Sequence, residues 1–113
     1  MSQRDDETLL RDMLVHARLA IEVSTDRSRT DLDSDVVFRS AVERLVQIVG
    51  EAASRINPMR RGLISGVPWE DIIGMRNRLV HGYAEIDRDV IWATLSRDLP
   101  DLIDRIATHL DDE

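Results

Sequence analysis

The apolar residues of this 113-residue chain recur every three to four positions, which is the spacing of an amphipathic α-helix. The pattern predicts four helices, which we expect at about residues 5–26, 35–56, 68–82 and 87–110. Asn57-Pro58 should end the second helix, since proline supplies no backbone N–H for the next turn. Pro100 should kink or divide the fourth helix for the same reason.

No segment shows the alternating pattern of a β-strand at comparable strength, so the sequence predicts an all-α protein. Short connections favour an antiparallel four-helix bundle, and the length fits one domain. We expect Asp33 or Ser34 to cap the N-terminus of the second helix. The longest link, from Pro58 to Val67, either contributes to a binding surface with its basic and apolar residues or is an ordinary surface loop.

Gly50 lies inside the predicted second helix, where glycine is less favourable than alanine by up to about 1 kcal/mol. Its presence there indicates that another backbone approaches closely. Helical spacing places Gly50 away from the main apolar face, so we expect a second contact face, formed with another copy of the chain in a homodimer. The alternative is a glycine that is simply tolerated on the surface.

Composition excludes several classes of site and of protein. The chain contains no cysteine, so it can form neither a disulfide framework nor a thiolate metal site. No apolar run approaches the roughly 20 residues needed to cross a bilayer, and the acidic N-terminal sequence does not resemble a signal peptide. We therefore expect a soluble, cytoplasmic protein that does not enter a membrane.

The net charge of −7 argues against a general attraction to nucleic acid, but the charge is distributed unevenly. Residues 55–83 hold five arginines against two acidic residues, whereas the C-terminal part of the chain is strongly acidic. A polyanion site is therefore expected within residues 55–83.

One arginine of this basic segment interrupts an apolar face of the predicted third helix. Arg76 falls near the centre of the face whose other members are Trp69, Ile72, Ile73, Leu79, Val80 and Tyr83. A guanidinium does not lose its proton, and burying it without partners is prohibitive. Arg76 must therefore meet a carboxylate, a subunit boundary or an anionic ligand.

Arg76, His81 and Tyr83 together suit phosphodiester chemistry that needs no metal ion. Histidine, with an unperturbed pKa of about 6.5, can take a proton from a 2′-hydroxyl or give one to a leaving 5′-oxygen. Arginine can stabilise the charge that develops on phosphorus. His81 lies about 140° around an ideal helix from Arg76. Either the helix unwinds near Gly82, or two copies meet and each site takes groups from both.

Each of these residues also has an ordinary structural explanation. A histidine near a helix end is often a partner of the helix dipole, and a tyrosine on an apolar face is often part of the core. An arginine on such a face is commonly paired with a buried carboxylate. Arg76 would then be a member of a structural ion pair in a plain helical bundle.

The segment RNRLVHGY at residues 76–83 fits the R-x4-H-x-Y signature of HepT-like toxins, which belong to the HEPN superfamily of small helical proteins. Three blocks, AVERLVQIVGEA, PWEDIIGMRNRLVHGY and IDRDVIWATLSRDLPDL, resemble the pattern of that family in the same order. The resemblance covers residues 34–105. It implies a single HEPN-like helical domain over residues 1–113.

This resemblance implies the toxin of a type II toxin–antitoxin pair, acting as a metal-independent endoribonuclease without a cofactor. Arg76 and His81 correspond to the catalytic pair of HepT-like proteins, whose active cleft forms between two protomers. The implied antitoxin is a nucleotidyltransferase of the MntA kind, which transfers AMP from ATP to the motif tyrosine, here Tyr83. The added phosphate would place negative charge where RNA phosphate binds. We expect Asn77 to orient a phosphate or the histidine.

A rival hypothesis from another class is a non-catalytic helical protein that binds a nucleotidyltransferase. Such a protein would present Tyr83 as a substrate or serve as a scaffold. Toxicity on expression of the chain alone fits only the nuclease.

Overall fold

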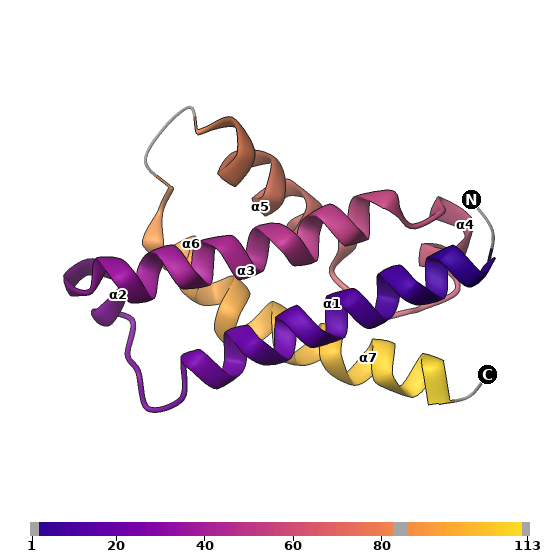
Figure 1. Cartoon of the computed structure of the whole chain (residues 1–113), viewed down its shortest axis with the longest axis horizontal. Coiled ribbons are helices and arrows are strands. Elements are labelled where there is room, and N and C mark those ends of the chain that lie inside the picture. The colour runs from indigo at the N-terminus through magenta and orange to yellow at the C-terminus, as the bar shows by residue number, and fades with distance from the viewer. Residues whose placement is uncertain (1–2, 83–85, 112–113) are drawn as a thin grey trace.

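The computed structural model describes residues 3–82 and 86–111, and within them every regular element is a helix. The prediction of an all-α protein is therefore confirmed. No helix in these two stretches is long and apolar enough to span a membrane. The elements in chain order (Figure 1) are α1 (Gln3–Val23), α2 (Asp31–Ser34), α3 (Val36–Arg55), α4 (Pro58–Gly62), α5 (Trp69–His81), α6 (Arg88–Ala93), the π-helix η1 (Thr94–Asp98) and α7 (Leu99–Asp111).

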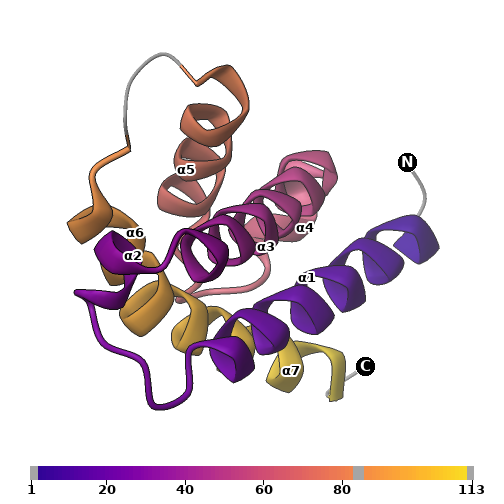
Figure 2. The same cartoon turned by 60° about the vertical axis from the view of Figure 1, so that its left-hand side comes forward.

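The two longest helices, α1 and α3, lie side by side and run in opposite directions (Figure 1). α3 also packs against α5, which lies on the other side of α3 from α1 (Figure 2). The C-terminal helix α7 packs against α1. α3 is therefore the central helix, with one side facing α1 and another facing α5.

The core consists of apolar side chains at the helical spacing that the sequence analysis identified. Completely buried members come from each long segment: Leu10 and Met13 in α1, Val42 and Val46 in α3, Ile72 in α5, Leu95 in η1, and Leu99, Leu102 and Ile106 in α7. Burying one such side chain stabilises the fold by about 1.5–3 kcal/mol. The four predicted helices correspond to α1, α3, α5 and the continuous run from α6 through η1 to α7.

The N-cap of α3 is Asp35, so our prediction of Asp33 or Ser34 is wrong. Those two residues belong to the short helix α2, and α3 begins directly after it. The Asp35 carboxylate accepts a hydrogen bond from the Arg27 guanidinium (2.7 Å) and one from the backbone N–H of Phe38 (3.0 Å). Both bonds lower the pKa of Asp35, because they favour its ionised form.

The link from Pro58 to Val67 contains a short helix, α4, which the sequence analysis did not predict. Asn57 caps this helix, since its side-chain oxygen accepts a hydrogen bond from the backbone N–H of Met59 (2.9 Å). α3 ends before Asn57, as predicted. α4 lies toward one end of the molecule and the C-terminus of α5 toward the other (Figure 1). The α4 part of the link is therefore far from the C-terminal end of α5 (Figure 1).

The fourth predicted helix is a continuous helical run in which a π-helical stretch, η1, replaces the α-helical hydrogen bonding just before Pro100. At the end of η1 the backbone N–H of Leu99 donates to the carbonyl oxygen of Thr94, five residues earlier. This widened turn ends directly before Pro100, whose nitrogen has no hydrogen to donate.

The start of α6 is attached to α2 by charged side chains. Arg29 bonds to Asp89 and Arg88 bonds to Asp33, the latter at 3.0 Å. The hydrogen bonds that Asp33 accepts from Arg88 and Arg29 lower its pKa. These contacts tie the start of α6 to the segment around α2.

Candidate active site

Arg76 lies on the side of α5 that packs against α3, directly over Gly50. A Cβ atom placed on Gly50 would be 2.3 Å from the Arg76 Cβ and 3.0 Å from the carbonyl oxygen of Ile72. The close backbone approach predicted for Gly50 is therefore confirmed. The predicted partner is wrong, because Gly50 is buried against α5 of its own chain and is not exposed for a homodimer contact.

The Arg76 guanidinium is half-buried, and its Nη1 donates a hydrogen bond to the side-chain oxygen of Asn77 (3.0 Å). Its Nε is buried and has no hydrogen-bond partner among residues 3–82 and 86–111. No carboxylate in those stretches pairs with it. A guanidinium that is partly buried beside an apolar face favours an anionic partner, because a buried donor left unpaired costs about 1–3 kcal/mol. Among the described residues nothing supports the explanation of Arg76 as a member of a structural ion pair.

His81 is the last residue of α5, and its side chain is exposed. Gly82 ends the helix in the left-handed conformation (φ 57°, ψ 29°), with its N–H donating to the carbonyl of Arg78 (3.1 Å). The helix is thus regular from Arg76 through His81. On a regular helix the two side chains are separated by about 140° and about 7.5 Å along the axis. The helix therefore does not unwind between Arg76 and His81 in a way that would bring them together.

The other two predicted site residues are Asn77 and Tyr83, of which the structure describes only Asn77. Asn77 is exposed, and its side-chain oxygen accepts the hydrogen bond from the Arg76 guanidinium. Tyr83 lies outside the described residues.

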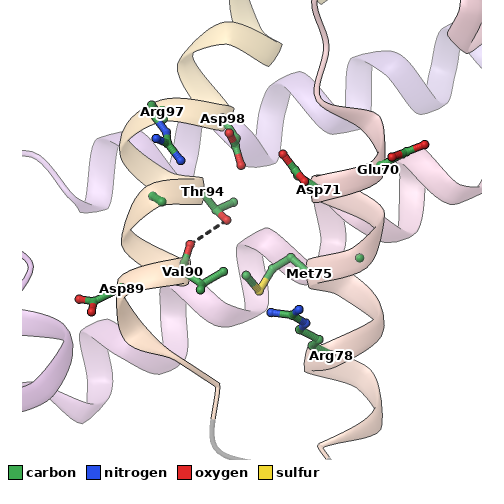
Figure 3. Close-up of a pocket in the computed structure, with 11 residues that line it drawn as sticks. Glu70, Asp71, Met75, Arg78, Asp89, Val90, Thr94, Arg97 and Asp98 are labelled. Atoms are coloured by element: carbon green, nitrogen blue, oxygen red, sulfur yellow. Dashed lines mark hydrogen bonds between the residues drawn. The ribbon is translucent and has the colours of Figure 1, made fainter.

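A groove of about 520 Å³ lies on another side of α5, between α5 and the α6–η1 segment (Figure 3). The side chains that border it include Asp71, Met75 and Arg78 from α5 and Asp89, Arg97 and Asp98 from the facing segment. Asp71 and Asp98 point toward one another across the groove (Figure 3). Burial raises the pKa of Asp98, and the negative charge of Asp71 raises it further.

This groove was not anticipated from the sequence, and its charge argues against a phosphate site. Glu70, Asp71, Asp89 and Asp98 outnumber the two arginines that line it. Arg76, Asn77 and His81 do not line it. The candidate active site therefore lies at the α3-facing side and the C-terminal end of α5, and not in the groove.

The arginines of residues 55–83 do not gather at one surface. Arg78 points into the acidic groove (Figure 3). Arg60 is buried in α4, and Arg76 faces α3. The basic segment of the sequence is thus divided among different parts of the molecule. Arg76 and Arg78 both lie on α5 with His81, and of the two only Arg76 faces α3.

The geometry can now be set beside known proteins. Residues 13–108 match the family model described as Ribonuclease HepT-like. Over 100 residues the chain is 36% identical to the protein named Putative RNase MJ1380 of Methanocaldococcus jannaschii, covering 88% of this chain and 92% of that protein. It is 32% identical over 104 residues to Putative RNase TTE0752 of Caldanaerobacter subterraneus subsp. tengcongensis, covering 92% and 93%.

A third relative is the Probable ribonuclease HepT of Thermococcus cleftensis, which is 30% identical over 100 residues, covering 88% of this chain and 91% of that protein. No solved structure matches the chain. The family match includes α3, α5, α6, η1 and most of α7. It therefore includes Gly50, on which Arg76 packs, and the helix that ends at His81. The resemblance stated from the RNRLVHGY segment is confirmed, and the chain belongs to the HepT-like ribonuclease family of the HEPN superfamily.

Proposed function

We propose that this protein is the toxin of a type II toxin–antitoxin system and a metal-independent endoribonuclease. In this proposal two antiparallel four-helix domains form a homodimer that cleaves RNA in the cytoplasm. The observation that supports it most directly is the Arg76 guanidinium, which is half-buried, has an unpartnered Nε and meets no carboxylate in the described part of the chain. In a chain of a ribonuclease family, an RNA phosphate is the anion that such a group would bind.

Two side chains divide the chemistry. The 2′-hydroxyl attacks the adjacent phosphorus while the bond from phosphorus to the 5′-oxygen breaks. His81 takes the proton from the 2′-hydroxyl or gives one to the leaving 5′-oxygen. Arg76 stabilises the negative charge of the phosphorane-like transition state, and Asn77 holds the guanidinium in place. The products are a 2′,3′-cyclic phosphate and a 5′-hydroxyl.

The proposed site takes Arg76 from one protomer and His81 from the other. A regular helix from Arg76 to His81 supports this arrangement, because it turns their side chains apart within one chain. Val80, directly before the histidine, is 42% exposed although it is apolar, and a second copy would cover it.

Metal independence can be tested on the purified protein. We expect the wild-type chain to cleave single-stranded RNA at an undiminished rate in excess EDTA, because Arg76 supplies the positive charge that a metal ion would otherwise supply. The measurement is gel analysis of an end-labelled RNA, with the product ends identified by mass spectrometry. Loss of cleavage in EDTA that returns with Mg²⁺ would contradict the proposed mechanism. A complete absence of cleavage in all conditions would favour the non-catalytic partner or scaffold.

Regulation by a nucleotidyltransferase of the MntA kind forms the second part of the proposal. AMP added to Tyr83, two residues after His81, would place a phosphate beside the site and repel RNA. On co-expression with that enzyme, we expect the intact mass of the chain to rise by whole AMP units and its cleavage to stop. Tyr83→Phe should keep both its mass and its activity under the same conditions. Inactivation of Tyr83→Phe by the enzyme would show that another residue, or binding alone, is responsible.

A further inference from the structure

Gly50 sits where α3 and α5 approach one another most closely beneath the candidate site. An added Cβ would lie 2.3 Å from the Arg76 Cβ, 3.0 Å from its Cγ and 3.0 Å from the carbonyl oxygen of Ile72. Carbon atoms in contact are normally about 3.5–4.0 Å apart. The clash involves the Cβ of Arg76 and the backbone of α5, so no rotation of the Arg76 side chain relieves it. Any side chain at position 50 must therefore move one helix by about 1 Å or more.

Such a movement would displace the part of Arg76 that acts on phosphate. The Nε of Arg76 is buried, and Nη1 is bonded to Asn77, so the guanidinium follows the backbone of α5. We infer that Gly50 is a positioning residue for Arg76, because it lets α5 lie close enough to α3 to hold the guanidinium at the place of the RNA phosphate. The expected effect on RNA cleavage rests on the proposed function. The geometry rests only on the contact between α3 and α5.

The chain itself provides a matched control. Gly74 is also a helical glycine, it lies in α5, and a Cβ added to it would meet nothing within 4 Å. Alanine is the better helix former, so Gly74→Ala should leave the fold as stable as before or more stable. Both substitutions add one methyl group to a helical glycine, but only the one at Gly50 collides with Arg76.

The first experiment measures RNA cleavage per folded molecule for both variants, with the folded fraction taken from circular dichroism. We expect Gly50→Ala to lower the rate by about 100-fold, which is the effect of misplacing a catalytic group by about 1 Å. Gly74→Ala should cleave at nearly the wild-type rate. Equal rates for the two variants would overturn the inference.

A second experiment separates positioning from general damage to the fold. Arg76→Ala removes the guanidinium but keeps the Cβ, so the collision with an alanine at position 50 is unchanged. We expect Gly50→Ala to reduce the residual cleavage of Arg76→Ala no further, since there is no guanidinium left to misplace. A further loss as large as that in the wild-type background would show that Gly50→Ala acts through the fold, or through His81 at the end of the same helix, and not through Arg76.

A third measurement needs no activity and so distinguishes failure of the inference from failure of the proposed function. Arg76→Gly removes the Cβ that an alanine at position 50 would strike. We expect Gly50→Ala to lower the midpoint of urea unfolding clearly less in the Arg76→Gly background than in the wild type. If the wild type cleaves no RNA but this coupling is found, the proposed function is wrong, while the close packing of Arg76 on Gly50 is confirmed. An equal decrease of the unfolding midpoint in both backgrounds would show that Arg76 does not pack closely on Gly50.

Discussion

Replacing His81 by alanine is expected to reduce RNA cleavage by about 100- to 10,000-fold, the usual contribution of a general acid or base. His81 is exposed at the end of α5, so the substitution removes no buried side chain and should leave the helical content unchanged. The rate of cleavage and the circular dichroism spectrum of the same preparation measure the two effects together. Expression of the His81→Ala chain should also no longer inhibit growth.

His16 provides the control for this experiment. It lies on α1, where its Nδ1 is 2.8 Å from the carbonyl oxygen of Asp12, and it has no place in the proposed site. His16→Ala should cleave RNA like the wild type. Cleavage that persists in His81→Ala, or that falls equally in both variants, would remove His81 from the mechanism.

Arg76→Ala is expected to lower cleavage by about 100- to 1,000-fold, the cost of removing one preorganised donor from a developing anion. Arg76→Lys should recover only part of the loss, because an ammonium cannot reproduce the planar donor array that binds Asn77 and a phosphate at once. Thermal unfolding should change little in either variant, since Arg76 has no ion pair to lose among residues 3–82 and 86–111.

Arg78→Ala is the control for charge. Arg78 lies two residues further along α5 and points into the acidic groove (Figure 3), so its loss removes the same charge from a different face. We expect Arg78→Ala to retain most of the cleavage. A stability loss in Arg76→Ala with undiminished cleavage would restore the structural explanation of this arginine.

The long helices could be predicted from the sequence because burial in this fold follows helical periodicity. Most of the apolar residues at helical spacing in α1, α3 and α7 are buried, whereas apolar residues at the ends and on the outer face, such as Val15 and Val37, are exposed. Asn57-Pro58 and Gly82 end their helices as their backbone chemistry requires. The short helices α2 and α4 were missed, since one turn has no periodicity to read. Asp35 was missed as the N-cap of α3 for the same reason, because α2 occupies the residues before it.

The contacts between helices could not be predicted in the same way. Gly50 was expected to face another copy of the chain, because it lies away from the main apolar face of its helix and no local pattern shows that α5 of the same chain covers this second face. The groove between α5 and η1 joins residues nearly thirty positions apart, such as Asp71 and Asp98, and no local pattern relates them. Arg76 is the exception, since a charge in the middle of an apolar face indicated the partial burial that the structure shows.

The account depends most on a site shared between two protomers, and mixing two inactive variants tests that directly. Arg76→Ala and His81→Ala chains are unfolded together, refolded and assayed on RNA. If each site takes its arginine from one protomer and its histidine from the other, every mixed dimer contains one intact site. With half of the dimers mixed, cleavage should return to about a quarter of the wild-type rate. No recovery, in a sample where mass spectrometry detects the mixed dimer, would contradict the shared site.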